Sequence, residues 1–65
     1  MKNLEAEKRW YMNAVEGCLI LRGMNREEAL LKISEYKLQE RLDKYPEIQM
    51  HYDIEATVEE ILDIA

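Results

Sequence analysis

The first third of the chain carries one long helical pattern, and this pattern limits the fold more than any other feature. Asn3 can cap its start, Gly23 follows a cationic last turn at its end, and no proline lies between them. The sequence therefore predicts a helix over residues 4–22, about 28 Å long. With two glycines and one proline in 65 residues, little room is left for a turn-rich all-β fold, so we expect an all-α chain.

The apolar residues of this first helix cover a wide arc. They span roughly 200° of its circumference, more than the stripe of an ordinary surface helix. One neighbouring helix cannot cover such an arc, so this helix is either the central element of a compact bundle or the helix that contacts a second molecule. We expect the second, with a protein partner or another copy of the chain. The residues predicted to bind there are Trp10, Tyr11, Val15 and Leu19.

A second helical region follows Asn25, which has the capping-box spacing to Glu28. Its apolar residues fall on two nearly opposite faces, one before position 37 and one after it. A break near Tyr36 and Lys37 resolves this conflict and gives a helix over 26–36 and a short helix over 38–44. One continuous helix between two partners is the alternative.

The segment after Pro46 alternates apolar and polar residues with a period of two. No other segment offers a matching strand, so we expect an extended segment over 46–53, packed as a loop on the helices. A strand paired with another copy is the alternative.

The last part of the chain predicts a final helix, capped by Thr57 with Glu60 or, one turn earlier, by Asp53. Its apolar stripe contains Ile54, Val58, Ile61, Leu62 and Ala65. The expected architecture is one helical domain over residues 1–65, a small bundle of three main helices plus one short helix.

Charge is unevenly distributed along the chain. Residues 1–44 hold nine Lys or Arg and eight Asp or Glu, whereas residues 45–65 hold six acids and no Lys or Arg, which gives the net charge of −5. Such an acidic field repels nucleic-acid phosphate and attracts basic surfaces. We therefore expect no direct nucleic-acid binding, and we assign Glu59 and Glu60 to partner contact.

Membrane and secreted classes are also disfavoured. The longest aliphatic run, residues 18–21, is far shorter than the roughly 20 residues that a membrane span needs, and the start lacks the pattern of a secretory signal. The lone Cys18 cannot form an internal disulfide, which fits a reducing compartment. These features predict a cytoplasmic protein.

Few residues could carry catalysis. The residue types of a nucleophilic site are present, as Cys18 with His51 or as Ser34 with His51 and Asp53. The sequence shows no glycine-rich segment that could form an oxyanion hole beside them. His51, Asp53 and Glu55 fall short of the ligand set of a structural metal site. The chain is also too short to enclose a typical small-molecule pocket. We expect no enzyme activity, no cofactor, no metal and no small-molecule substrate.

One set of residues carries a resemblance. They are Glu35, Tyr36, Lys37, Leu38, Leu42, Tyr45, His51 and the run Val58, Glu59, Glu60, Ile61, Leu62. With these residues the chain resembles short bacterial helical proteins of unknown function, some of them encoded beside toxin genes. The resemblance implies a small bacterial or phage protein that acts by binding, and it transfers no catalytic residue.

These observations together predict a non-enzymatic protein–protein interaction module that uses the apolar face of its first helix. An antitoxin-like or phage-encoded inhibitor is the alternative, in which the acidic C-terminal segment covers a basic site on the target.

Overall fold

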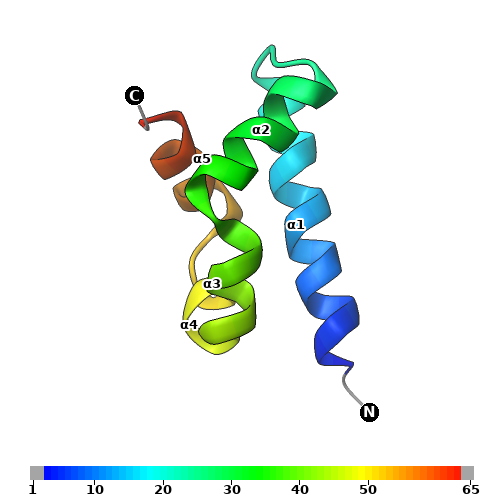
Figure 1. Ribbon diagram of the computed structural model, residues 1–65, viewed down its shortest axis with the longest axis vertical. Coiled ribbons are helices and arrows are strands. Elements are labelled where there is room, and N and C mark those ends of the chain that lie inside the picture. The colour runs from blue at the N-terminus through cyan, green and yellow to red at the C-terminus, as the bar shows by residue number, and fades with distance from the viewer. Residues whose placement is uncertain (1–2, 64–65) are drawn as a thin grey trace.

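A computed structural model shows an all-α protein and describes residues 3–63 (Figure 1). The helices, in chain order, are α1 (Leu4–Leu21), α2 (Arg26–Tyr36), α3 (Leu38–Lys44), α4 (Pro46–His51) and α5 (Ile54–Leu62). The all-α prediction is confirmed, and residues 3–63 contain no strand. Ala65, the last member of the predicted C-terminal stripe, lies outside the described residues.

Both ends of α1 follow from its sequence. The Asn3 side chain accepts a backbone N–H from the first turn, as an N-cap does. Gly23 follows the other end with a φ of +104°, and the Met24 N–H donates to the Leu19 carbonyl over 3.2 Å. A left-handed glycine with this bond satisfies carbonyls that the helix end leaves free. The helix ends at Leu21, one residue before the predicted end.

The break between α2 and α3 is confirmed. Asn25 and Glu28 form the predicted capping box, in which Asn25 accepts the Glu28 N–H over 2.8 Å. At the other end of α2, Lys37 has a φ of 61° and a ψ of 43°, the left-handed conformation. One residue in this conformation stops α2 and redirects the chain into α3. The apolar faces before and after it can therefore pack toward the same core.

The predicted extended segment over 46–53 is wrong, because residues 46–51 form helix α4. Pro46 occupies the first helical turn, where its fixed φ suits a helix and its missing N–H costs nothing. Ile48 is 61% exposed and the polar Gln49 is 3% exposed. Alternation misled the prediction because a polar residue, and not an apolar one, faces the interior here.

Helix α5 begins at Ile54 with Asp53 at the N-cap position, so the earlier of the two predicted starts is the observed one. The Asp53 side chain makes no capping hydrogen bond. Thr57, the alternative cap, is instead buried within the helix at 1% exposure.

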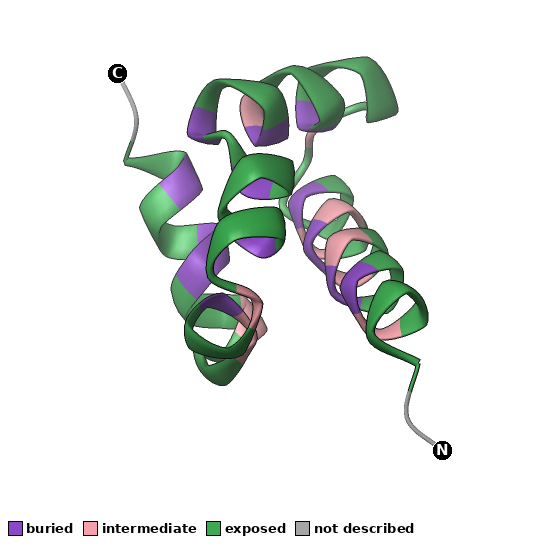
Figure 2. Ribbon diagram, turned by 60° about the horizontal axis from the view of Figure 1, so that its bottom comes forward, coloured by how far each residue is buried: buried purple, intermediate pink, exposed green. Residues whose placement is uncertain are grey.

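The core forms where α1 meets the other helices. Helix α1 contacts each of α2, α3, α4 and α5, and α5 also packs against α2. Figure 2 shows the buried residues of α1 on the side that faces these helices. The buried apolar residues are Tyr11, Val15, Leu19, Ala29, Ile33, Tyr36, Leu38, Leu42, Val58 and Ile61. No helix within residues 3–63 is long and apolar enough to span a bilayer.

Candidate functional site

A buried polar network holds α4 and α5 against α1. The Tyr11 hydroxyl lies 2.6 Å from the Thr57 hydroxyl and donates to the Tyr52 carbonyl over 3.1 Å. The Gln49 amide donates to Thr57 over 3.2 Å and to Tyr11 over 3.4 Å. Among the described residues, no buried side-chain nitrogen or oxygen is left without a partner. The network therefore fixes the place of α4 without the cost of an unsatisfied polar group.

Two neighbouring hollows lie along the line where α1 meets α4 and the start of α5. They measure about 440 and 460 Å³, and both are lined by Met50 and His51. We call them together the α1–α4 groove. The remaining lining residues are Leu4, Glu7, Trp10, Tyr11, Glu47, Tyr52, Asp53, Ile54 and Glu55. Both hollows are open to solvent, so the groove is a surface feature.

Trp10 is the largest apolar side chain on this groove, and it is 64% exposed. Glu7 lies three residues from both Leu4 and Trp10, so it neighbours each of them on the surface of α1. Across the groove, Tyr52 is 52% exposed. Exposed tryptophan and tyrosine side chains are typical anchors of protein interfaces, because they combine a large apolar area with a polar group.

The charge of the groove has one sign. Four carboxylates line it, those of Glu7, Glu47, Asp53 and Glu55, and no Lys or Arg among residues 3–63 does. Within residues 3–63, none of these four carboxylates makes an ion pair. Within the described part of the chain, their negative charge is therefore not neutralised by a neighbouring cation.

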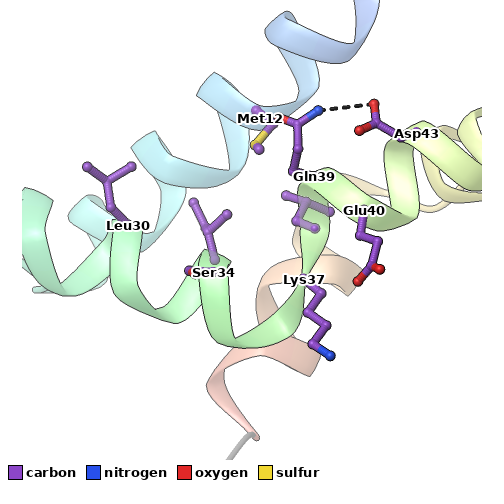
Figure 3. Close-up of a pocket in the computed structure, with 9 residues that line it drawn as sticks. Met12, Leu30, Ser34, Lys37, Gln39, Glu40 and Asp43 are labelled. Carbon is purple, nitrogen blue, oxygen red and sulfur yellow. Dashed lines mark hydrogen bonds between the residues drawn. The ribbon is translucent and has the colours of Figure 1, made fainter.

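A separate hollow, of about 510 Å³, lies between α1, α2 and α3 and is shown in Figure 3. We call it the α2–α3 cleft. Met12 and Leu30 contribute apolar surface, and Lys37 stands on its rim. Its carboxylates are already engaged, because Asp43 pairs with Lys8 over 3.0 Å and Glu40 with Lys44 over 3.6 Å. This cleft therefore has apolar surface, but the charges of these two carboxylates are already balanced by lysines of the chain.

Three of the four predicted partner-binding residues of α1 lie inside the protein. Tyr11 is 2% exposed, and Val15 and Leu19 are fully buried beneath the chain's own later helices. A partner cannot contact them in this structure, so their assignment to a partner surface is corrected to the core. Trp10 remains on the surface because it lies near the edge of the apolar arc.

Glu59 and Glu60, the other predicted partner residues, are engaged within the chain. Glu59 accepts from Arg22 over 2.9 Å, and Glu60 accepts from the Tyr36 hydroxyl over 2.5 Å. Burial, together with this bond to Glu60, raises the pKa of Tyr36 to about 12, although the nearby Arg41 guanidinium opposes the shift. These contacts join α5 to α1 and α2.

One further ion pair joins α1 to α3. The Lys8 ammonium group lies 3.0 Å from Asp43 and 3.1 Å from Glu5. The hydrogen bond to Asp43, followed by the one to Glu5, raises the pKa of Lys8. The hydrogen bond from Lys8, followed by one from Gln39, lowers the pKa of Asp43. This pair lies beside the α2–α3 cleft and stabilises its wall.

The residues considered for catalysis lie apart. Ser34 lines the α2–α3 cleft, whereas His51 and Asp53 line the α1–α4 groove, so these three do not share a hollow. Cys18 is partly buried against the core. Among residues 3–63, no group of three or more His, Cys, Asp and Glu side chains is placed to hold a metal ion.

The sequence pattern does not identify the groove carboxylates as a set. Glu47, Asp53 and Glu55 belong to the acidic last third, and this signal was visible. Glu7 could be joined to them only once α4 was placed beside α1. No family model matches the chain, and neither the curated proteins nor the solved structures contain a match.

Proposed function

We propose that this chain is a non-enzymatic protein-binding module whose contact surface is the α1–α4 groove. The observation that carries the proposal is the 64% exposure of Trp10, the chain's one tryptophan, beside an open groove with further apolar lining. Burial of such a side chain by a partner is favourable by about 25 cal/mol for each Å² of apolar surface removed from water.

The groove favours a protein over other ligands. Its uncompensated carboxylates repel the phosphates of nucleic acids and of anionic lipid surfaces. Its two hollows are open, whereas small-molecule sites surround most of their ligand. An open apolar strip with a charged rim is the usual form of a surface that receives a protein segment.

An inhibitor-like role is a specific version of this proposal. In that version the acidic groove covers a basic site on a target and blocks it. The supporting feature is again the row of unpaired carboxylates, now located beside Trp10 and not at Glu59 and Glu60, which bond within the chain.

The test compares three immobilised proteins as baits in an extract of the native host. The wild type and two variants, Trp10→Ala and Leu31→Ala, are used. Leu31 is 62% exposed and does not line the groove, so it is a matched control. We expect proteins retained by the wild type and by Leu31→Ala to be lost with Trp10→Ala. Equal retention by all three baits would contradict the proposal.

Self-association is examined in the same proteins. Sedimentation of the wild type and of Trp10→Ala measures whether a second copy occupies the groove. A dimer that dissociates on replacement of Trp10 would make another copy the partner. Circular dichroism checks that each variant retains its helices, which we expect because both replaced side chains are exposed.

A further inference from the structure

We infer that the segment received by the α1–α4 groove is positively charged and carries a bulky apolar side chain beside Trp10. This inference rests on the proposed function and adds the chemistry of the partner. Its basis is the pairing state of the carboxylates. The carboxylates of the α2–α3 cleft form ion pairs with lysines of the chain. Within residues 3–63, the carboxylates of the α1–α4 groove form no ion pair.

Helix-end electrostatics accounts for part of this placement. Glu7, Glu47 and Glu55 each lie in the first turn of a helix, where a negative charge interacts favourably with the helix dipole. This effect favours a carboxylate in the first turn of each helix. It does not explain why the first-turn carboxylates of three helices, together with Asp53, line the same groove. The convergence arises because α4 and α5 both begin near the N-terminal half of α1 (Figure 1).

The same charge argues against a second copy in this groove. Two chains of net charge −5 that met groove to groove would bring eight carboxylates together around one contact, four from each groove. Like charges placed opposite one another disfavour association, whereas Lys or Arg of another protein would pair with them. A foreign basic segment is therefore the occupant that matches the groove.

The size of the groove fits a short helical segment. Leu4 and Trp10 mark its length along α1, a rise of about 9 Å, or nearly two turns of a helix. A helix that lies there can place an apolar residue against Trp10 and Met50 on one face. Basic residues that flank this face then reach the carboxylates on the rim.

The experiment titrates defined peptides and follows the fluorescence of Trp10, which reports on the groove alone because the chain has no other tryptophan. The first peptide is a leucine–lysine amphipathic helix of about four turns. The second has glutamate in place of every lysine, and the third has alanine in place of every leucine. We expect only the first to bind tightly and shift the emission, with binding that weakens as salt is added.

Two double variants isolate the position of the charge. Glu7→Gln with Glu55→Gln removes two groove carboxylates, and Glu27→Gln with Asp63→Asn removes two carboxylates elsewhere that make no ion pair within residues 3–63. Glu27 also lies in the first turn of a helix, so the control reproduces a helix-end effect. We expect the groove variant to bind the leucine–lysine peptide about three- to tenfold more weakly, and the control to change by less than about twofold.

Three results would overturn the inference: tight binding of the glutamate peptide, equal weakening by both double variants, or a wild-type dimer that buries Trp10. The proposed function is judged separately by the dependence of captured proteins on Trp10. Capture that needs Trp10 and is unaffected by the loss of Glu7 and Glu55 would preserve the module and eliminate the basic partner. Capture that does not need Trp10 would eliminate the module even if the peptide binds by charge.

Discussion

The Tyr36 hydroxyl donates a hydrogen bond to the Glu60 carboxylate over 2.5 Å, and this bond joins α2 to α5. Tyr36 is 8% exposed, and the Arg41 guanidinium lies 4.1 Å from the centre of its ring. The last turn of α2 is therefore held from two sides, by a carboxylate of α5 and by a cation of α3. The contact works only while the phenol keeps its proton.

This contact predicts a loss of stability in alkali. The pKa of Tyr36 is about 12 in the folded chain, above its ordinary value of 10.0. A raised pKa means that the contribution to stability is complete below pH 10 and is lost as the pH rises toward 12. Tyr36→Phe should lower the free energy of unfolding at neutral pH by about 0.5–1.5 kcal/mol and flatten this alkaline decline.

Urea unfolding of both proteins, at several pH values between neutral pH and about 12, measures how much stability each protein loses in alkali. All other ionisable groups are common to the two proteins, so the difference between their curves reports on Tyr36. Parallel curves for the wild type and the variant would contradict the assignment.

The buried network predicts strong coupling between Tyr11 and Thr57. Thr57→Val leaves the Tyr11 hydroxyl and the Gln49 amide with fewer partners, so it should destabilise the chain by about 1–3 kcal/mol. Tyr11→Phe removes a shared partner. The double variant should therefore lose less than the sum of the two single losses, as a double-mutant cycle by urea unfolding can show. Strictly additive losses would mean that the two hydroxyls act independently.

The burial of Val15 predicts that a charge at this position unfolds the chain. Val15 is fully buried, and a small core supplies only about 3–5 kcal/mol of stability. An unpaired carboxylate there should exceed this margin, so Val15→Asp should lack the helical circular dichroism of the wild type. Asn13→Asp, an exposed change on the same helix, is the control and should remain folded. A folded Val15→Asp protein would show that this position is not enclosed.

The left-handed conformation of Lys37 predicts that glycine is favourable at this position. A side chain in this region costs about 1–2 kcal/mol, and glycine avoids that cost while losing some backbone entropy. Lys37→Gly should therefore raise the free energy of unfolding by about 0.5–1 kcal/mol, whereas the β-branched Lys37→Val should lower it. Urea unfolding measures the stability of both variants. A Lys37→Gly protein less stable than the wild type would argue against the left-handed conformation at this position.

Local signals in the sequence predict α1, α2 and α3 well. Asn3, Gly23 and the pair Asn25 and Glu28 act on residues within one turn of themselves, so their effect can be derived without the fold. The break at Lys37 could be derived because apolar faces on opposite sides of one helix cannot share a core. Residues 46–51 were misassigned since Gln49 is acceptable inside only with Tyr11 and Thr57 beside it, and those partners are distant in sequence.

The candidate site was less predictable, for a related reason. Periodicity identifies the apolar arc of α1 but does not say which part of it the later helices cover. Trp10 and Val15 belong to the same arc, and only the packing of α5 and α2 against α1 places one on the surface and the other in the core. The groove carboxylates required information of the same kind, because Glu7 and Glu47 line one hollow only through the packing of α4 against α1.

The short helices that follow the left-handed Lys37 also restrict where a residue can be inserted into this chain. One residue added within α3 would turn everything after it by about 100° around the helix axis. Met50 and His51 would then swing away from α1, and the two walls of the groove would no longer oppose each other. An added residue beside Gly23 or Asn25, both exposed in the turn at 22–25, can bulge outward instead, so insertions should be tolerated before α2 and not after Lys37.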